Sequence, residues 1–144
     1  MSANLYEKDF YAWARRQSQL LRAGRYADLD LVHLIEEVED MGGHVRRQLA
    51  SRLEVLLMHL LKWRHQPNLT GKSWRLTIAE QRRRIAKLLR KNPSLTPELD
   101  ELLADAYEDA RFGAMLETGL DLAVFPEDCP FTLIEVLDPE YLPD

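Results

Sequence analysis

Cysteine is almost absent from this sequence, and that scarcity excludes two kinds of scaffold. Cys129 is the only cysteine among the 144 residues. A single thiol cannot close an internal disulfide, and it cannot supply the paired cysteines of a zinc finger. We therefore expect Cys129 to pack as a small apolar side chain.

Long apolar runs and glycines are also scarce. The longest nearly uninterrupted apolar run, Val55 to Leu61, is broken by His59 and falls far short of the roughly 20 residues that cross a bilayer. The N-terminus lacks the basic and apolar stretches of a secretory signal. With 46% hydrophobic residues, 30% charged residues and 6 glycines, the composition is that of a globular helical protein. We expect a cytoplasmic protein that does not span a membrane.

Apolar residues recur at three- and four-residue steps in several segments, which predicts α-helices. Capping or breaking residues bound them, such as Asp30 as an N-cap, Gly42-Gly43 as a stop and Ser73 as a second N-cap. No segment alternates with a period of two residues, so no β-sheet is predicted. We predict one all-α domain over residues 1–144, a compact antiparallel bundle of about five helices with a short C-terminal helix in an irregular tail. The predicted helices cover about residues 9–23, 30–41, 44–66, 73–91, 97–118 and 131–137.

The periodicity also predicts which side chains are buried. The second half of helix 44–66 is apolar on every side, as expected at the centre of a bundle; its core residues are Val55, Leu56, Leu57, Met58, Leu60 and Leu61. In helix 30–41 we expect the stripe to face the core; it comprises Leu31, Leu34, Ile35, Val38 and Met41. His33, Glu36 and Asp40 then face solvent. Gln17 and Gln81 lie in apolar stripes, so we expect them to bond each other or nearby backbone.

Charge is distributed very unevenly along the chain. Residues 72–91 hold eight Lys or Arg and one Glu, whereas residues 98–144 hold fourteen Asp or Glu and one Arg. Such a separation suits a face that binds nucleic acid or another anion. It suits equally two neighbouring helices that complement each other across a surface, and we favour that interpretation.

Several short motifs, in the same order along the whole chain, resemble a bacterial family known as domain of unknown function 29. They are Leu5-Tyr6 through Asp9, Tyr11 and Trp13; Leu34 to Gly42; Leu60-Leu61-Lys62-Trp63 with Pro67; Ser73-Trp74-Arg75 with Gln81-Arg82; Ala106 to Arg111; and Cys129-Pro130-Phe131-Thr132. The resemblance implies a compact helical fold. It implies no catalytic or ligand-binding residue, so function must be sought in the side chains themselves.

Acidic residues of two helices are the weak candidates for a metal site. Glu37 and Glu39 border the expected core face of helix 30–41, and Glu108 and Asp109 lie on helix 97–118. Carboxylates that project from helices can hold a divalent metal. A long apolar helix and a basic helix separate the two acidic sets, however, and no Glu-x-x-His motif of a di-iron bundle is present. We therefore expect neither a metal nor a cofactor.

His59 interrupts the most apolar stretch of the chain, and Arg52 lies two turns earlier on the same side. A buried imidazole needs hydrogen-bond partners, which Glu37 or Glu39 can supply. Such an Arg-His-Glu cluster has altered pKa values and is a candidate functional site. A core histidine that is satisfied locally explains the same pattern, and we favour it.

The connection from Lys62-Trp63 to Lys72 and Trp74-Arg75 is the third candidate, because it combines two tryptophans with basic residues at a helix N-terminus. Backbone N–H groups and cations there suit an anion, and interleaved aromatics suit single-stranded nucleic acid. Both tryptophans also fall on apolar faces, which favours a packing role. Arg82, Arg83 and Arg84 continue the positive surface, and Arg82 alone approaches the core boundary.

Three functions remain open. We favour a non-enzymatic helical module that binds a protein partner or itself. No nucleophile motif or phosphate-binding glycine loop is present, and the surface charge is strongly separated. One alternative is nucleic-acid or phosphate binding through the basic face of residues 62–91, including Lys72, Arg75 and Arg82 to Arg84. The other is a divalent-metal-dependent hydrolase that uses Glu37, Glu39 and acidic residues of helix 97–118.

Overall fold

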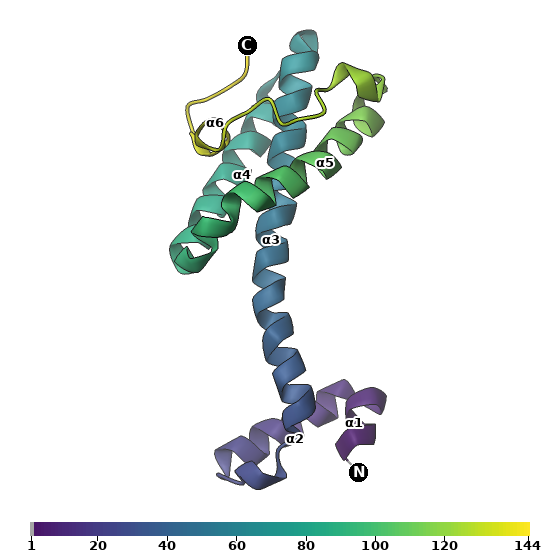
Figure 1. The fold of residues 1–144 in the computed structure, drawn as a ribbon, viewed down its shortest axis with the longest axis vertical. Helices are drawn as coiled ribbons and strands as arrows, with labels where there is room; N and C mark the ends of the chain where they lie inside the picture. The colour runs from purple at the N-terminus through teal and green to yellow at the C-terminus, as the bar shows by residue number, and fades with distance from the viewer. Residues whose placement is uncertain (1) are drawn as a thin grey trace. The chain divides into compact units, whose positions relative to one another are not determined.

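The computed structural model describes the backbone of residues 2–144 and the side chains from Leu5 onward, and the all-α prediction is confirmed across that range. The helices are α1 (Ser2–Lys8), α2 (Phe10–Arg22), α3 (Leu31–His65), α4 (Lys72–Lys91), α5 (Leu99–Thr118) and α6 (Leu133–Leu137) (Figure 1). Short 3₁₀ turns link them at Tyr26–Asp28, Pro67–Leu69, Pro93–Glu98 and Leu122–Val124. Within residues 2–144, no helix combines the length and apolar composition that a bilayer crossing requires.

The predicted stop at Gly42-Gly43 is wrong, because α3 continues through both glycines and is 35 residues long. A glycine in a helix interior costs only about 1 kcal/mol relative to alanine, which is too little to end a helix flanked by good helix formers. Glycine does end a helix where it takes a left-handed conformation. Gly24 and Gly119 have φ angles of 71° and 75° and follow α2 and α5.

Two helix starts also differ from the prediction. The N-cap assigned to Ser73 is wrong, because α4 begins at Lys72 after an extended Gly71. The residues around Pro97 form a 3₁₀ turn, so α5 begins at Leu99. The short last helix is confirmed as α6. Thr132 and Glu135 form a capping box at its start, in which each side chain bonds the other's backbone N–H.

The helices group into two compact units, which meet between His44 and Val45 within α3. Unit 1 contains α1, α2 and the first part of α3, and unit 2 contains the rest of α3 with α4, α5 and α6. The single domain over residues 1–144 stays a prediction. One cooperative unfolding transition of the whole chain would support it.

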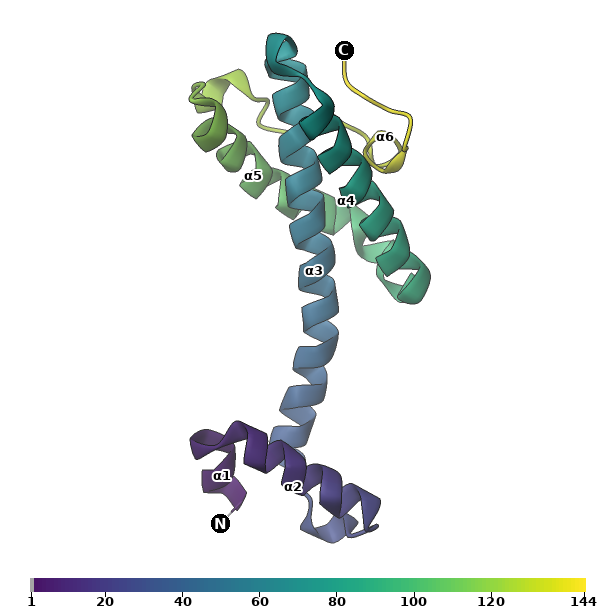
Figure 2. The ribbon, with the colours of Figure 1, turned by 180° about the vertical axis from the view of Figure 1, so that it is seen from behind.

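The second half of α3 forms the centre of unit 2, as predicted. Both α4 and α5 lie against it, and α6 lies beside α4 (Figures 1 and 2). The α3 side chains with no exposed surface are Leu49, Leu53, Leu56, Leu57, Leu60 and Leu61. They pack with Ile78 and Ile85 of α4, Ala110 of α5 and Val136 of α6 in one continuous core. These leucines lie on one broad face of α3, whereas the predicted core residues Val55 and Met58 are only partly buried.

Candidate functional site

Asp30 organises the junction of the three helical segments in unit 1. Its Oδ1 accepts a hydrogen bond from the backbone N–H of His33 at 3.4 Å, so it caps α3 as predicted. Its Oδ2 accepts from Trp13 Nε1 at 2.9 Å and lies 2.7 Å from Nδ1 of His33. Because an ionised carboxylate can only accept, Nδ1 of His33 carries the proton in this contact. Gln17 Oε1 accepts from the backbone N–H of Asp30 at 2.8 Å, which confirms the expected backbone bond of this glutamine.

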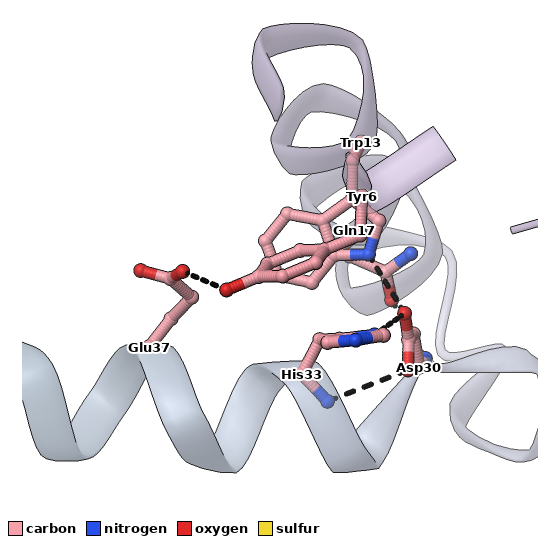
Figure 3. A network of polar contacts seen from close by, with 6 residues as sticks. All are labelled: Tyr6, Trp13, Gln17, Asp30, His33 and Glu37. Atoms are coloured by element: carbon pink, nitrogen blue, oxygen red, sulfur yellow. Dashed lines mark hydrogen bonds and ion pairs between the residues drawn. The ribbon is translucent and has the colours of Figure 1, made fainter. Parts of the chain in front are cut away.

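These contacts shift the pKa of Asp30. Burial by itself would raise the pKa of this carboxyl, but hydrogen bonds from His33 and Trp13 outweigh burial and hold the pKa below its usual value. Asp30 therefore stays ionised, and its charge is satisfied by three donors. We refer to Tyr6, Trp13, Gln17, Asp30, His33 and Glu37 as the Asp30 cluster; Figure 3 shows how they converge between α1, α2 and α3.

Tyr6 attaches α1 to α3 through both its ring and its hydroxyl. The hydroxyl donates to Glu37 Oε1 at 2.6 Å (Figure 3). The ring stacks on that of His33 with centroids 3.8 Å apart, and the edge of Trp13 meets it at 4.8 Å. The hydrogen bond to the Glu37 carboxylate, and burial after it, raise the pKa of Tyr6 well above its usual value. The hydroxyl therefore remains a donor throughout the physiological pH range.

The expected inner face of helix 30–41 is wrong for most of its apolar residues, and so is the expected exposure of His33, whereas Glu36 and Asp40 face solvent as expected. His33 and Glu37 contact α1 and α2, while apolar side chains face away. Tyr6 and Trp13 each carry a polar atom that needs a partner when buried, so polar residues of α3 meet them. The exposed fractions are 58% for Leu31, 58% for Ile35, 63% for Val38 and 67% for Met41. We call these four residues the open face of α3.

Two pairs of cations and aromatic rings join the end of α3 to the start of α4 in unit 2. Lys62 of α3 lies 5.0 Å from the ring centroid of Trp74, and Arg75 of α4 lies 5.2 Å from that of Trp63. Lys62 is 8% exposed and donates to Glu117 Oε1 of α5 at 2.8 Å. These contacts hold three helices together. Lys72, the first residue of α4, and Arg75 are both exposed.

Arg82 is buried and holds the C-terminal segment in place. Its guanidinium donates to the backbone carbonyls of Val136 at 2.9 Å, Tyr141 at 2.7 Å and Glu135 at 3.2 Å. The residue is 6% exposed, and burial lowers the pKa of its guanidinium from a very high usual value. All three bonds use a charged donor, which strengthens them. Its neighbours Arg83 and Arg84 are exposed and pair with Glu80 on the surface.

The structure does not bring together the predicted cluster of Arg52, His59 and a carboxylate. Arg52 Nη1 donates to Gln81 Oε1 at 3.2 Å, whereas Gln17 Oε1 accepts from the backbone of Asp30, so the predicted bond between the two glutamines is not observed. Nδ1 of His59 lies 2.9 Å from the backbone carbonyl of Val55. A carbonyl only accepts, so Nδ1 carries the proton. His59 therefore satisfies itself within α3.

The half-buried His59 makes the stability of unit 2 dependent on pH. Burial lowers the pKa of His59, the Val55 carbonyl opposes that shift, and burial also lowers the pKa of His65. Below the unfolded pKa of about 6.5, the unfolded chain takes up protons that the folded chain refuses. We expect the free energy of unfolding to fall from pH 7.5 towards pH 5.5, by up to about 1.4 kcal/mol per pH unit for each histidine.

Urea unfolding across this pH range measures the slope. His59→Gln keeps a donor without titrating and should flatten the slope, whereas His44→Gln, at an exposed position of α3, should leave it unchanged. If the free energy of unfolding still depends on pH in the double variant His59→Gln/His65→Gln, the two histidines are not the cause.

The acidic candidates of the two helices are placed differently from one another. Glu37 is engaged by Tyr6, and Glu39 is exposed on α3. Glu108 and Asp109 are exposed on α5 and line a cavity of about 280 Å³ with Arg111, Phe112 and Leu122. Across the part of the chain that the structure describes, no three His, Cys, Asp or Glu residues are grouped in a way that could hold a metal ion.

The basic residues of α4 form an exposed face. Lys72, Arg83, Lys87 and Arg90 fall within an arc of about 60° on this helix, and all four are exposed. Among residues 5–144, the ion pairs that reach the acidic C-terminal half come from Arg46 and Lys62 of α3. No ion pair in this range joins residues 72–91 to residues 98–144. The basic and acidic segments therefore do not neutralise each other through ion pairs in the way that the sequence suggested.

Two features of the structure were missed by the sequence patterns. The Asp30 cluster had a signal, because Tyr6 and Trp13 carry polar atoms on an apolar stripe and need acceptors. The position of Arg82 at the core boundary indicated that it is partly buried, but its binding to the C-terminal segment had no signal, because backbone carbonyls carry no sequence signature.

Comparison with known proteins agrees with the resemblance of the motifs. The sequence matches no curated protein and no solved structure. A family model described as domain of unknown function DUF29 matches residues 5–142, which is almost the whole chain. That match and the all-α structure together show that this chain belongs to the DUF29 family.

Proposed function

We propose that this protein is a helical interaction module that binds a helix of a protein partner along the open face of α3. The observation that carries the proposal is the row of four large apolar side chains, each more than half exposed, on one helix of unit 1. Single exposed apolar residues are ordinary on protein surfaces, whereas a contiguous row marks an interaction site. Apolar residues spaced along one helix face are the usual anchors for a second helix.

The Asp30 cluster supports this function by orienting α3. Three donors fix Asp30 at the start of the helix, and the stack of Tyr6 on His33 fixes its first two turns. Both sets of contacts lie on the side of α3 that α1 and α2 occupy. The open face is thus presented by a rigid support, which lowers the entropy cost of binding.

Photo-crosslinking in the producing cell tests the proposal. A benzophenone amino acid in place of Val38 should form adducts, and one in place of Leu76 on α4, a residue that is 58% exposed, should not. The variant Ile35→Lys should abolish the adducts from position 38, because a lysine cannot be buried unpaired in an apolar interface. Equal adducts from both positions, or none from position 38, would refute a binding surface here.

A second candidate function is binding of nucleic acid or phosphate by the exposed basic face of α4. The observation in its favour is that Lys72, Arg83, Lys87 and Arg90 share one exposed face. Binding of this kind releases counterions and weakens steeply with salt. Retention on immobilised single-stranded DNA should fall as salt rises, and Lys87→Gln should reduce the salt dependence. A protein that passes through the DNA column at low salt does not have this function.

A further inference from the structure

We propose that the partner helix is α3 of a second copy of this chain, laid antiparallel against the open face. This inference rests on the proposed function and names its partner. A two-fold pair brings the same patch of both copies together, so the patch must be complementary to itself. The spacing of apolar residues and glycine along the first part of α3 provides that complementarity.

The register follows from the steps between residues. Leu31, Ile35, Val38 and Gly42 are separated by four, three and four positions, the spacing of a two-helix seam. At about 100° per residue they share an arc of about 60° on the helix. In an antiparallel pair centred midway between residues 36 and 37, Ile35 faces Val38 of the second copy, and Leu31 faces Gly42.

Gly42 is the small member of this seam. Apart from the glycine's own stretch of helix, no atom lies within 4 Å of the position that a Cβ would occupy there, so the space beside Gly42 is open in the single chain. The side chain of Leu31, exposed at the other end of the seam, fills that space in the pair. Large residues opposite small ones give the interdigitated packing of protein interiors. The glycines at positions 42 and 43 destabilise an isolated helix, and pairing offsets this by adding apolar contacts to that stretch.

Most acidic residues of this part of α3 lie away from the seam. Glu36, Glu37 and Asp40 lie about 130° or more from the centre of the seam on the helix circumference. Glu37 is moreover engaged by Tyr6 on the side of α1. No charged residue lies in the seam itself, and Glu39, about 70° from its centre, is the carboxylate that flanks it.

Sedimentation velocity of the full chain over a range of concentrations tests the pairing. The wild-type chain should form a dimer that dissociates on dilution. Gly42→Leu should weaken the dimer about tenfold or more, because the new side chain collides with Leu31 of the second copy. Leucine is a better helix former than glycine, so the folded chain should not lose helix content by circular dichroism. Leu31→Ala added to Gly42→Leu exchanges the large and small positions and should restore the dimer.

Each result separates this inference from the proposed function. A dimer unaffected by Gly42→Leu, or not restored by the exchange, overturns the register and with it the pairing. A wild-type chain that stays monomeric, while position 38 still forms adducts with another protein, overturns self-pairing and leaves the interaction module standing. Adducts of twice the chain mass from position 38 support both.

Discussion

Arg82→Met should lower the free energy of unfolding by about 3 kcal/mol, and the melting temperature by about 10 °C or more. The substitution removes all three hydrogen bonds to the carbonyls of Glu135, Val136 and Tyr141. A buried acceptor left without a donor costs about 1–3 kcal/mol, and methionine fills much of the volume without replacing any donor. Thermal unfolding followed by circular dichroism measures the loss.

The C-terminal segment should also become accessible in this variant. Limited proteolysis should cut between α6 and the C-terminus faster in Arg82→Met than in the wild type, because local opening precedes cleavage. Arg83→Met is the matched control, since Arg83 is exposed and pairs only with Glu80 on the same helix. It should change neither the melting temperature nor the cleavage rate. Equal behaviour of the two variants would show that Arg82 does not hold the segment.

Asp30→Ala should destabilise the attachment of α2 to α3 by about 2 kcal/mol or more. The substitution removes the cap of α3 and leaves Trp13 Nε1 without its acceptor. It also removes the negative charge that His33 faces at 2.7 Å. Hydrogen exchange measures the effect, since the amides of α2 should exchange faster while those of α5 in unit 2 keep their rates.

The matched control for Asp30 is Asp28→Ala. Asp28 pairs with Arg25 on the surface, so its loss should leave the exchange of α2 unchanged. Asp30→Asn should fall between the two, because an amide retains one acceptor for the cap. An unchanged α2 in Asp30→Ala would refute the role of the cluster.

Acid should reproduce the effect of Asp30→Ala in the wild type. The folded pKa of Asp30 lies below its unfolded value of about 3.8, so the stabilisation is complete above that value. It is lost as the pH falls through the lower, folded pKa.

The orientation of the first part of α3 within unit 1 determines which of its side chains are available for binding. The spacing of apolar residues in helix 30–41 predicts a row on one face, and the sequence alone favours its burial in the core. Because the structure turns Leu31, Ile35, Val38 and Met41 outward, the same row becomes the basis for an interaction surface. An interaction module is still the favoured function. The proposed binding surface is the exposed apolar side chains of the open face, and no longer the separated charges.

The sequence by itself determined the helical fold class, the burial of Leu56, Leu57, Leu60 and Leu61, and the short capped helix at the end of the chain. Local sequence determines these features. A strongly apolar helical segment is stable only in the core, and the capping box that starts the last helix involves residues within four positions of each other.

Only the tertiary structure decided which face of the first part of α3 is open, and where Lys62 and Arg82 place their charges. Periodicity shows which residues share a helix face, but the contacts of that face depend on polar atoms distant in sequence. The Tyr6 hydroxyl and the Trp13 N–H require acceptors, which Glu37 of α3 and Asp30, the residue that caps α3, supply. The carbonyls bound by Arg82 lie more than 50 residues along the chain, where no local pattern reaches.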